Sequence, residues 1–94
     1  MTTQVEFISA PWCARCKVLR PVVEETCRIA GATFSYVNFD ELDDDGELKL
    51  AIKSLPSMRT RLASQQEWII WPASEIDSWR FAVLGAAVFN DPEF

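Results

Sequence analysis

Two cysteines, Cys13 and Cys16, are separated by two residues at the point where a short apolar segment gives way to a helical pattern. This placement suits thiol–disulfide exchange, because unpaired backbone N–H groups and the positive end of a helix dipole stabilise a thiolate at a first turn. The flanking Arg15 and Lys17 indicate an electropositive, partly exposed setting. We therefore expect a solvent-facing, reactive Cys13 with Cys16 close enough to resolve it.

Two other interpretations of the pair stay open. If the pair formed half of a zinc site, the metal would need further nitrogen or sulfur ligands. The chain has no histidine and only one further cysteine, Cys27. An unreactive, packed pair is the second alternative, since free cysteines are often buried. The acidic run 43–45 is better explained as the start of a short helix than as a metal site. We therefore expect no metal.

The 94 residues suffice for a single domain, 1–94, with one hydrophobic core. The formal net charge of −5 leaves no basic stripe for a nucleic-acid backbone. No apolar run approaches the roughly 18 residues needed to span a membrane. The first residues lack the basic start and apolar stretch of a signal peptide, so we expect a cytoplasmic protein. In that compartment the cysteines should be reduced thiols or form a redox couple. We also expect the protein to be a monomer.

Hydrophobic periodicity and turn residues predict the order strand, helix, strand, helix, strand, strand, helix. The expected elements are residues 5–9, 13–30, 32–39, 46–53, 57–62, 67–71 and 74–89. Gly31 should end the first helix, and Pro21 should kink that helix without breaking it. Ser74 and Asp77 resemble a capping box for the last helix. The pattern implies a small mixed α/β sheet with helices packed on its faces.

The chain resembles the thioredoxin and glutaredoxin family over nearly its whole length. The resemblance is carried by strand 5–9, by 10–17 (APWCARCK), by Pro21, by 37–40 (VNFD) and by 55–57 (LPS). It implies a thioredoxin-like fold, β-α-β-α-β-β-α with four strands, and a thiol–disulfide oxidoreductase with no cofactor beyond its redox-active disulfide. Cys13 would attack a substrate disulfide, and Cys16 would resolve the mixed disulfide.

The resemblance also implies roles for residues around the two cysteines. Pro56 is expected to be cis, leaving backbone groups near Leu55 free to pair with an extended substrate. Trp12 is expected to shield the sulfurs. Ala14 and Arg15 replace the Gly-Pro of typical thioredoxins and the Pro-Tyr of typical glutaredoxins. An arginine there should favour the thiolate and make the couple more oxidising.

Glu6 is the candidate for the buried acid that many thioredoxins use to move the proton of the resolving cysteine. It lies seven residues before Cys13, one more than the usual offset. A shift of one residue reverses the face of a strand unless a bulge intervenes, so a solvated strand acid is the alternative. The chain also lacks the N-terminal strand and helix of full thioredoxins. We therefore expect a sheet with one partly open face. The alternation of Arg59 and Arg61 with less polar neighbours agrees with a strand that has one polar face.

Protein disulfides are the expected substrates, with ribonucleotide reductase as one candidate, and a thioredoxin-type reductase is the expected electron donor. Glutathione use is disfavoured, because 55–56 (LP) and 71–74 (WPAS) stand where glutathione users carry Thr-Val-Pro and a Gly-Gly-x-Asp type segment. The alternatives are a glutathione-dependent glutaredoxin and a non-redox binding subunit. The latter would use an apolar stripe of Phe81, Leu84 and Val88.

Cys27 should lie on the same helix as Cys16, about 16 Å farther along its axis. A disulfide needs Cα atoms within about 7 Å, so Cys27 cannot bridge to the pair. We expect it to serve in packing.

Overall fold

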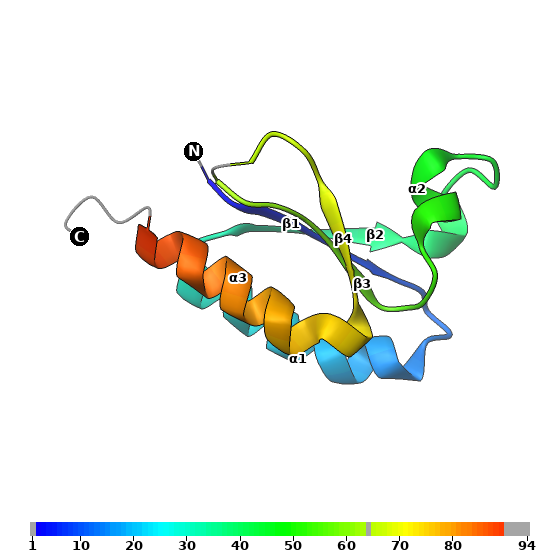
Figure 1. The fold of residues 1–94 in the computed structure, drawn as a ribbon. Helices are drawn as coiled ribbons and strands as arrows, with labels where there is room; N and C mark the ends of the chain where they lie inside the picture. The colour runs from blue at the N-terminus through cyan, green and yellow to red at the C-terminus, as the bar shows by residue number, and fades with distance from the viewer. Residues whose placement is uncertain (1, 64, 90–94) are drawn as a thin grey trace.

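The computed structural model describes residues 2–63 and 65–89 (Figure 1). In chain order its elements are β1 (Gln4–Ser9), α1 (Ala14–Ala30), β2 (Thr33–Asn38), the 3₁₀ turn η1 (Phe39–Glu41), α2 (Glu47–Ala51), β3 (Ser57–Arg61), β4 (Ile69–Pro72), the 3₁₀ turn η2 (Ala73–Glu75) and α3 (Ile76–Phe89). The expected order of strands and helices is confirmed. None of the helices in this described part is long and apolar enough to cross a membrane.

The four strands form one sheet in the order β2-β1-β3-β4. β1 pairs in parallel with β2 and antiparallel with β3, and β3 pairs antiparallel with β4. The parallel pair needs a crossover connection, which α1 supplies, whereas β3 and β4 form the hairpin expected from the sequence. The mixed four-stranded α/β fold is therefore confirmed.

Helix α1 begins and ends where local chemistry predicts. Cys13 is its N-cap residue in an extended conformation. Gly31 ends it at φ 68°, a left-handed conformation that glycine adopts without a Cβ penalty, and its N–H donates to the carbonyl of Arg28. Pro21 lies inside the helix without breaking it, and the expected kink stays a prediction.

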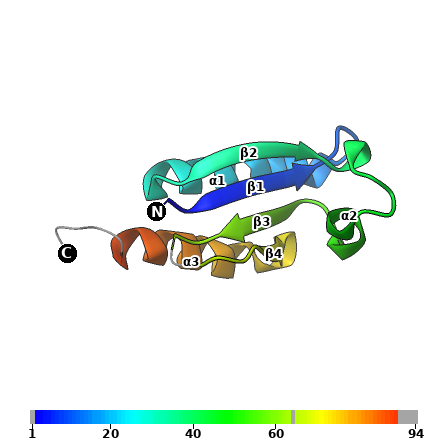
Figure 2. The ribbon, with the colours of Figure 1, turned by 90° about the horizontal axis from the view of Figure 1, so that it is seen from above.

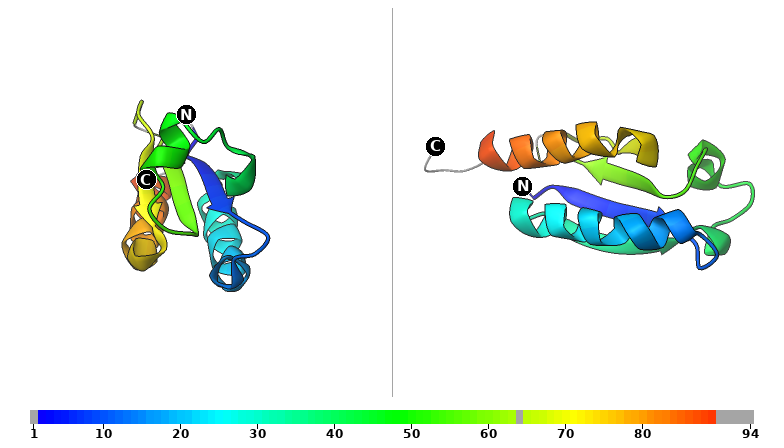
Figure 3. Two further views of the ribbon diagram at one scale, coloured as in Figure 1. Left: turned by 90° about the vertical axis from the view of Figure 1, so that its right-hand side faces the viewer. Right: turned by 90° about the horizontal axis from the view of Figure 1, so that it is seen from below.

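Helices α1 and α3 lie side by side on one face of the sheet (Figures 1 and 3). The buried core between the helices and the sheet includes Val5, Phe7, Cys13, Cys16, Val23, Cys27, Met58, Trp79 and Val83. The indole N–H of Trp79 donates to Thr60 Oγ1 at 2.8 Å, a buried hydrogen bond that joins α3 to β3. This face therefore fixes the position of α1, whose first turn carries both cysteines.

The second face of the sheet carries polar side chains. Helix α2 lies beyond one end of the strands rather than over this face (Figures 1 and 2). Glu6 forms an ion pair with Arg59 at 2.9 Å, and Arg61 donates to Gln4. Both guanidinium groups lie over the ring of Trp68, 4.5 and 5.1 Å from its centre. Neither arginine is buried, so the expected partly open face is confirmed.

The capping box expected at the last helix is wrong. The chain enters the 3₁₀ turn η2 directly after Pro72, so Ser74 lies inside this turn, and α3 begins at Ile76. Ser74, which the sequence pattern assigns to the N-cap of α3, is part of the 3₁₀ turn η2 instead. On α3, Phe81 is exposed and Leu84 half-buried, while the side chain of Val88 lies outside the described part.

Candidate active site

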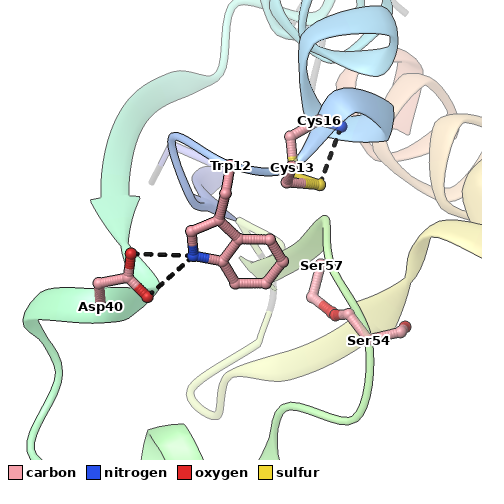
Figure 4. The surroundings of a disulfide bond; sticks show 6 residues. All are labelled: Trp12, Cys13, Cys16, Asp40, Ser54 and Ser57. Carbon is pink, nitrogen blue, oxygen red and sulfur yellow. Dashed lines mark hydrogen bonds between the residues drawn. A yellow bond between two sulfur atoms is a disulfide. The ribbon is translucent and has the colours of Figure 1, made fainter.

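Cys13 and Cys16 form a disulfide at the N-terminus of α1, with their Cα atoms 5.3 Å apart (Figure 4). The backbone N–H of Cys16 donates to Cys13 Sγ at 3.1 Å. This N–H is one of the first-turn donors that have no partner within the helix. It therefore points at the atom on which negative charge would reside after reduction.

The exposure of the two cysteines differs less than the sequence predicts. Cys13 is 7% exposed and Cys16 2% exposed. Cys13 is thus the more accessible member, but the expectation that it faces solvent is wrong in degree. The N–H of Cys13 donates to the carbonyl of Ala10, which closes the loop after β1, and both cysteines belong to the buried core.

Trp12 is held beside the disulfide by Asp40, a contact that the sequence does not predict. Its indole N–H donates to both carboxylate oxygens of Asp40, at 3.0 and 3.2 Å (Figure 4). Asp40 lies in η1, directly after β2, and its own N–H donates to Asn38 Oδ1. Trp12 stays 67% exposed, so its ring presents a large apolar surface next to the sulfurs. An acid directly after the second strand is the sequence signal that could have identified this contact.

The segment before β3 lies across from the disulfide. The Leu55–Pro56 bond is cis, as expected from the family pattern. Pro56 is buried and Leu55 half-buried. Ser57 Oγ donates to the carbonyl of Ser54 at 2.7 Å, which closes the turn around this proline (Figure 4). Pairing of the Leu55 backbone with a substrate stays a prediction.

Glu6 lies on the face of the sheet away from α1. β1 pairs with β3 in a continuous register from Gln4 to Ile8, without the bulge that a reversal of face would need. Phe7, one residue later, is fully buried in the core that contains Cys16. Glu6 instead pairs with Arg59 on the open face. This geometry favours the alternative, a structural strand acid, over a role in proton transfer.

A cleft of about 270 Å³ opens beside Cys16, between α1 and β2. It is lined by Ser9, Ala10, Pro11, Cys16, Lys17, Arg20, Tyr36 and Asn38. The Arg20 guanidinium lies 4.3 Å from the centre of the Tyr36 ring. The sequence does not predict this cleft, because it depends on the parallel pairing that places β2 next to the start of α1.

The remaining cysteine, Cys27, is buried and free. Burial and the nearby charge of Glu24 raise the pKa of its thiol to about 11. The expected packing role is consistent with this environment. Within residues 2–63 and 65–89, no group of three or more Cys, His, Asp or Glu side chains is placed to hold a metal ion.

Comparisons with known proteins agree with this geometry. The family model described as Thioredoxin matches residues 2–73. No curated protein matches the chain. The crystal structure of thioredoxin f from spinach chloroplast (long form) is similar, with a TM-score of 0.69 and 16% identity over 90% of this chain and 70% of that chain. Chloroplastic thioredoxin z is similar with a TM-score of 0.61 and 21% identity, over 89% of this chain and 80% of that chain. At these identities the two structures support the fold alone.

Proposed function

Because the chain belongs to the thioredoxin family, we propose that it reduces disulfides of protein substrates by thiol–disulfide exchange at Cys13 and Cys16. The observation that carries this proposal is the disulfide at the first turn of α1, with the Cys16 N–H directed at Cys13 Sγ. Both the family and the paired sulfurs fit a thiol–disulfide oxidoreductase. That the substrates are protein disulfides is part of the proposal.

The reaction proceeds in two exchanges. In the reduced protein, the Cys13 thiolate attacks one sulfur of the substrate disulfide, forms a mixed disulfide and releases the other substrate sulfur as a thiolate. The Cys16 thiol loses its proton and attacks Cys13 Sγ, which releases the second substrate thiolate and forms the Cys13–Cys16 disulfide. Two electrons pass to the substrate, and the released thiolates take up protons.

A dithiol donor must then reduce the Cys13–Cys16 disulfide. We propose a flavoprotein disulfide reductase of the thioredoxin-reductase type as this donor. The exposed ring of Trp12 and the segment between Ser54 and Ser57 lie on the same side of the disulfide (Figure 4) and offer a surface for an extended protein segment. Glutathione with its own reductase is the alternative donor.

Insulin reduction by the full chain tests the proposal, with NADPH and a thioredoxin reductase in one reaction and glutathione with its reductase in another. Cys13→Ser should abolish turnover with either donor. Cys16→Ser should form a mixed disulfide with substrate that persists, because the resolving thiol is absent. Cys27→Ser is the matched control and should retain turnover. If Cys13→Ser retained turnover, the proposed chemistry would be wrong.

Arg15 is exposed in the first turn of α1 and should favour the Cys13 thiolate over the thiol. Stabilising the reduced form makes a dithiol couple more oxidising. We therefore expect Arg15→Pro to lower the reduction potential by roughly 30 mV, the equivalent of one pKa unit for two electrons. Equilibration with glutathione buffers measures this potential, and an unchanged or higher value would contradict the role.

A further inference from the structure

The pairing of cationic side chains is uneven across the molecule. The chain contains nine Lys and Arg residues, all within the described part. Seven of them donate to another residue, and these are Arg20, Arg28, Lys49, Lys53, Arg59, Arg61 and Arg80. Arg15 and Lys17 form no hydrogen bond or ion pair with any other described residue. Among the described residues, the two cations without a partner are therefore the ones on either side of Cys16.

Lys17 also lines the cleft beside Cys16, together with Arg20. The other lining residues are neutral, and Ser9 and Asn38 add a hydroxyl and an amide. The first turn of α1 contains no acidic residue. Although the chain has a net charge of −5, the lining of this cleft contains two cations and no acid. Arg20 is ion-paired with Glu24 at 2.6 Å, so Lys17 is the lining cation that has no partner among the described residues. Exposed charges that lack an internal partner act on molecules that approach the site, through attraction of opposite charge.

We propose that this cleft receives an Asp or Glu side chain of the partner protein, with Lys17 as its ion-pair partner. The inference rests on the proposed function and specifies its substrate class, namely protein disulfides with an acidic residue near one cysteine. The cleft lies beside Cys16, whose Cα is 5.3 Å from that of Cys13. Lys17 lies about 6 Å beyond Cys13 along the axis of α1, and an extended segment advances about 3.3 Å per residue, so an acid about two residues from the attacked cysteine can reach it.

The test uses three disulfide peptides that differ only beside their cysteines, with Asp, Asn or Lys at the flanking positions. The full chain, reduced by dithiothreitol and freed of it, is mixed with each peptide, and the second-order rate is followed by the loss of protein thiols. We expect the Asp peptide to react about three- to fivefold faster than the Asn peptide at low salt, as for one exposed ion pair. The Lys peptide should react more slowly than both. High salt should reduce these differences.

Lys17→Gln should abolish the preference for Asp over Asn. Arg28→Gln is the matched control, because it removes the same charge about 16 Å farther along α1 and should keep the preference. The readout is a ratio of rates for two peptides, so a general change in the reactivity of Cys13 cancels.

Equal rates for the Asp and Asn peptides would overturn the inference while leaving the proposed function in place. An undiminished preference in Lys17→Gln, or an equal loss in Arg28→Gln, would overturn it as well. Reduction of glutathione disulfide as fast as the Asp peptide would assign the cleft to a small anionic disulfide instead. Failure of the protein to react with any of the peptides would contradict the proposed function itself, and the inference with it.

Discussion

Replacement of Glu6 by Gln separates a structural acid from a catalytic one. Glu6 Oε1 lies 2.9 Å from Arg59 Nη1, and the two side chains are 26% and 29% exposed. A partly buried, charged hydrogen bond of this kind contributes about 1 kcal/mol to the free energy of unfolding. Arg59 keeps its contact with the Trp68 ring in the variant, so the loss should not exceed this value by much.

For a domain of this size, a loss of about 1 kcal/mol lowers the melting temperature by roughly 4 to 8 °C. Glu25→Gln supplies the matched control, because it makes the same chemical change in an exposed pair with Arg28 on α1. We expect a smaller shift for Glu25→Gln than for Glu6→Gln. Thermal unfolding followed by circular dichroism measures both.

The catalytic consequence is measured by insulin reduction between pH 5 and pH 9. The rate of Glu6→Gln should follow the same pH profile as the unaltered protein, because Glu6 lies on the sheet face away from α1. A general base typically contributes a factor of about 10² or more. If the variant lost that much activity, or if an inflection of the profile disappeared, Glu6 would be the proton acceptor and our interpretation of the sheet faces would be refuted.

Two further predictions concern the core. Thr60→Val should lower the free energy of unfolding by about 1 to 3 kcal/mol, because the buried indole N–H of Trp79 loses its acceptor, and urea denaturation would show it. Burial raises the pKa of Cys27 from 9.0 to about 11, so between these values the thiol ionises in the unfolded chain but not in the folded one. The free energy of unfolding should therefore fall by about 1.4 kcal/mol between pH 8 and pH 10, beyond the fall seen in Cys27→Ala. If the free energy of unfolding fell equally with pH in the unaltered protein and in Cys27→Ala, this prediction would be wrong.

Local chemistry accounts for the parts of the structure that the sequence predicts well. The start of α1 at the cysteine pair, its end at Gly31 and the β3–β4 hairpin each depend on residues close together in the chain. Turn residues and hydrophobic periodicity report such features directly. The alternation of Arg59 and Arg61 likewise identifies the open face of the sheet.

The parts that the sequence does not predict depend on contacts between distant residues. The contact of Trp12 with Asp40 joins residues 28 positions apart, and the cleft beside Cys16 needs β2 to pair in parallel with β1. The small exposure of Cys13 follows from the closed loop before α1, which a CxxC spacing does not specify. The role of Glu6 depends on which face of β1 its side chain occupies. A shift of one residue in the pairing of the strand would move that side chain to the other face.

Most cations of this protein are paired within the fold, whereas Arg15 and Lys17 have no partner among the described residues. On the open face, Glu6 pairs with Arg59, and Arg59 and Arg61 cover the ring of Trp68, so these charges are used within the fold. On the helical face, α1 is fixed by apolar packing, and its first turns carry cations that the fold does not require. Because the packing of α1 does not depend on Arg15 or Lys17, their charges are available to a partner. A protein of negative net charge can in this way present a cleft without acids beside its disulfide.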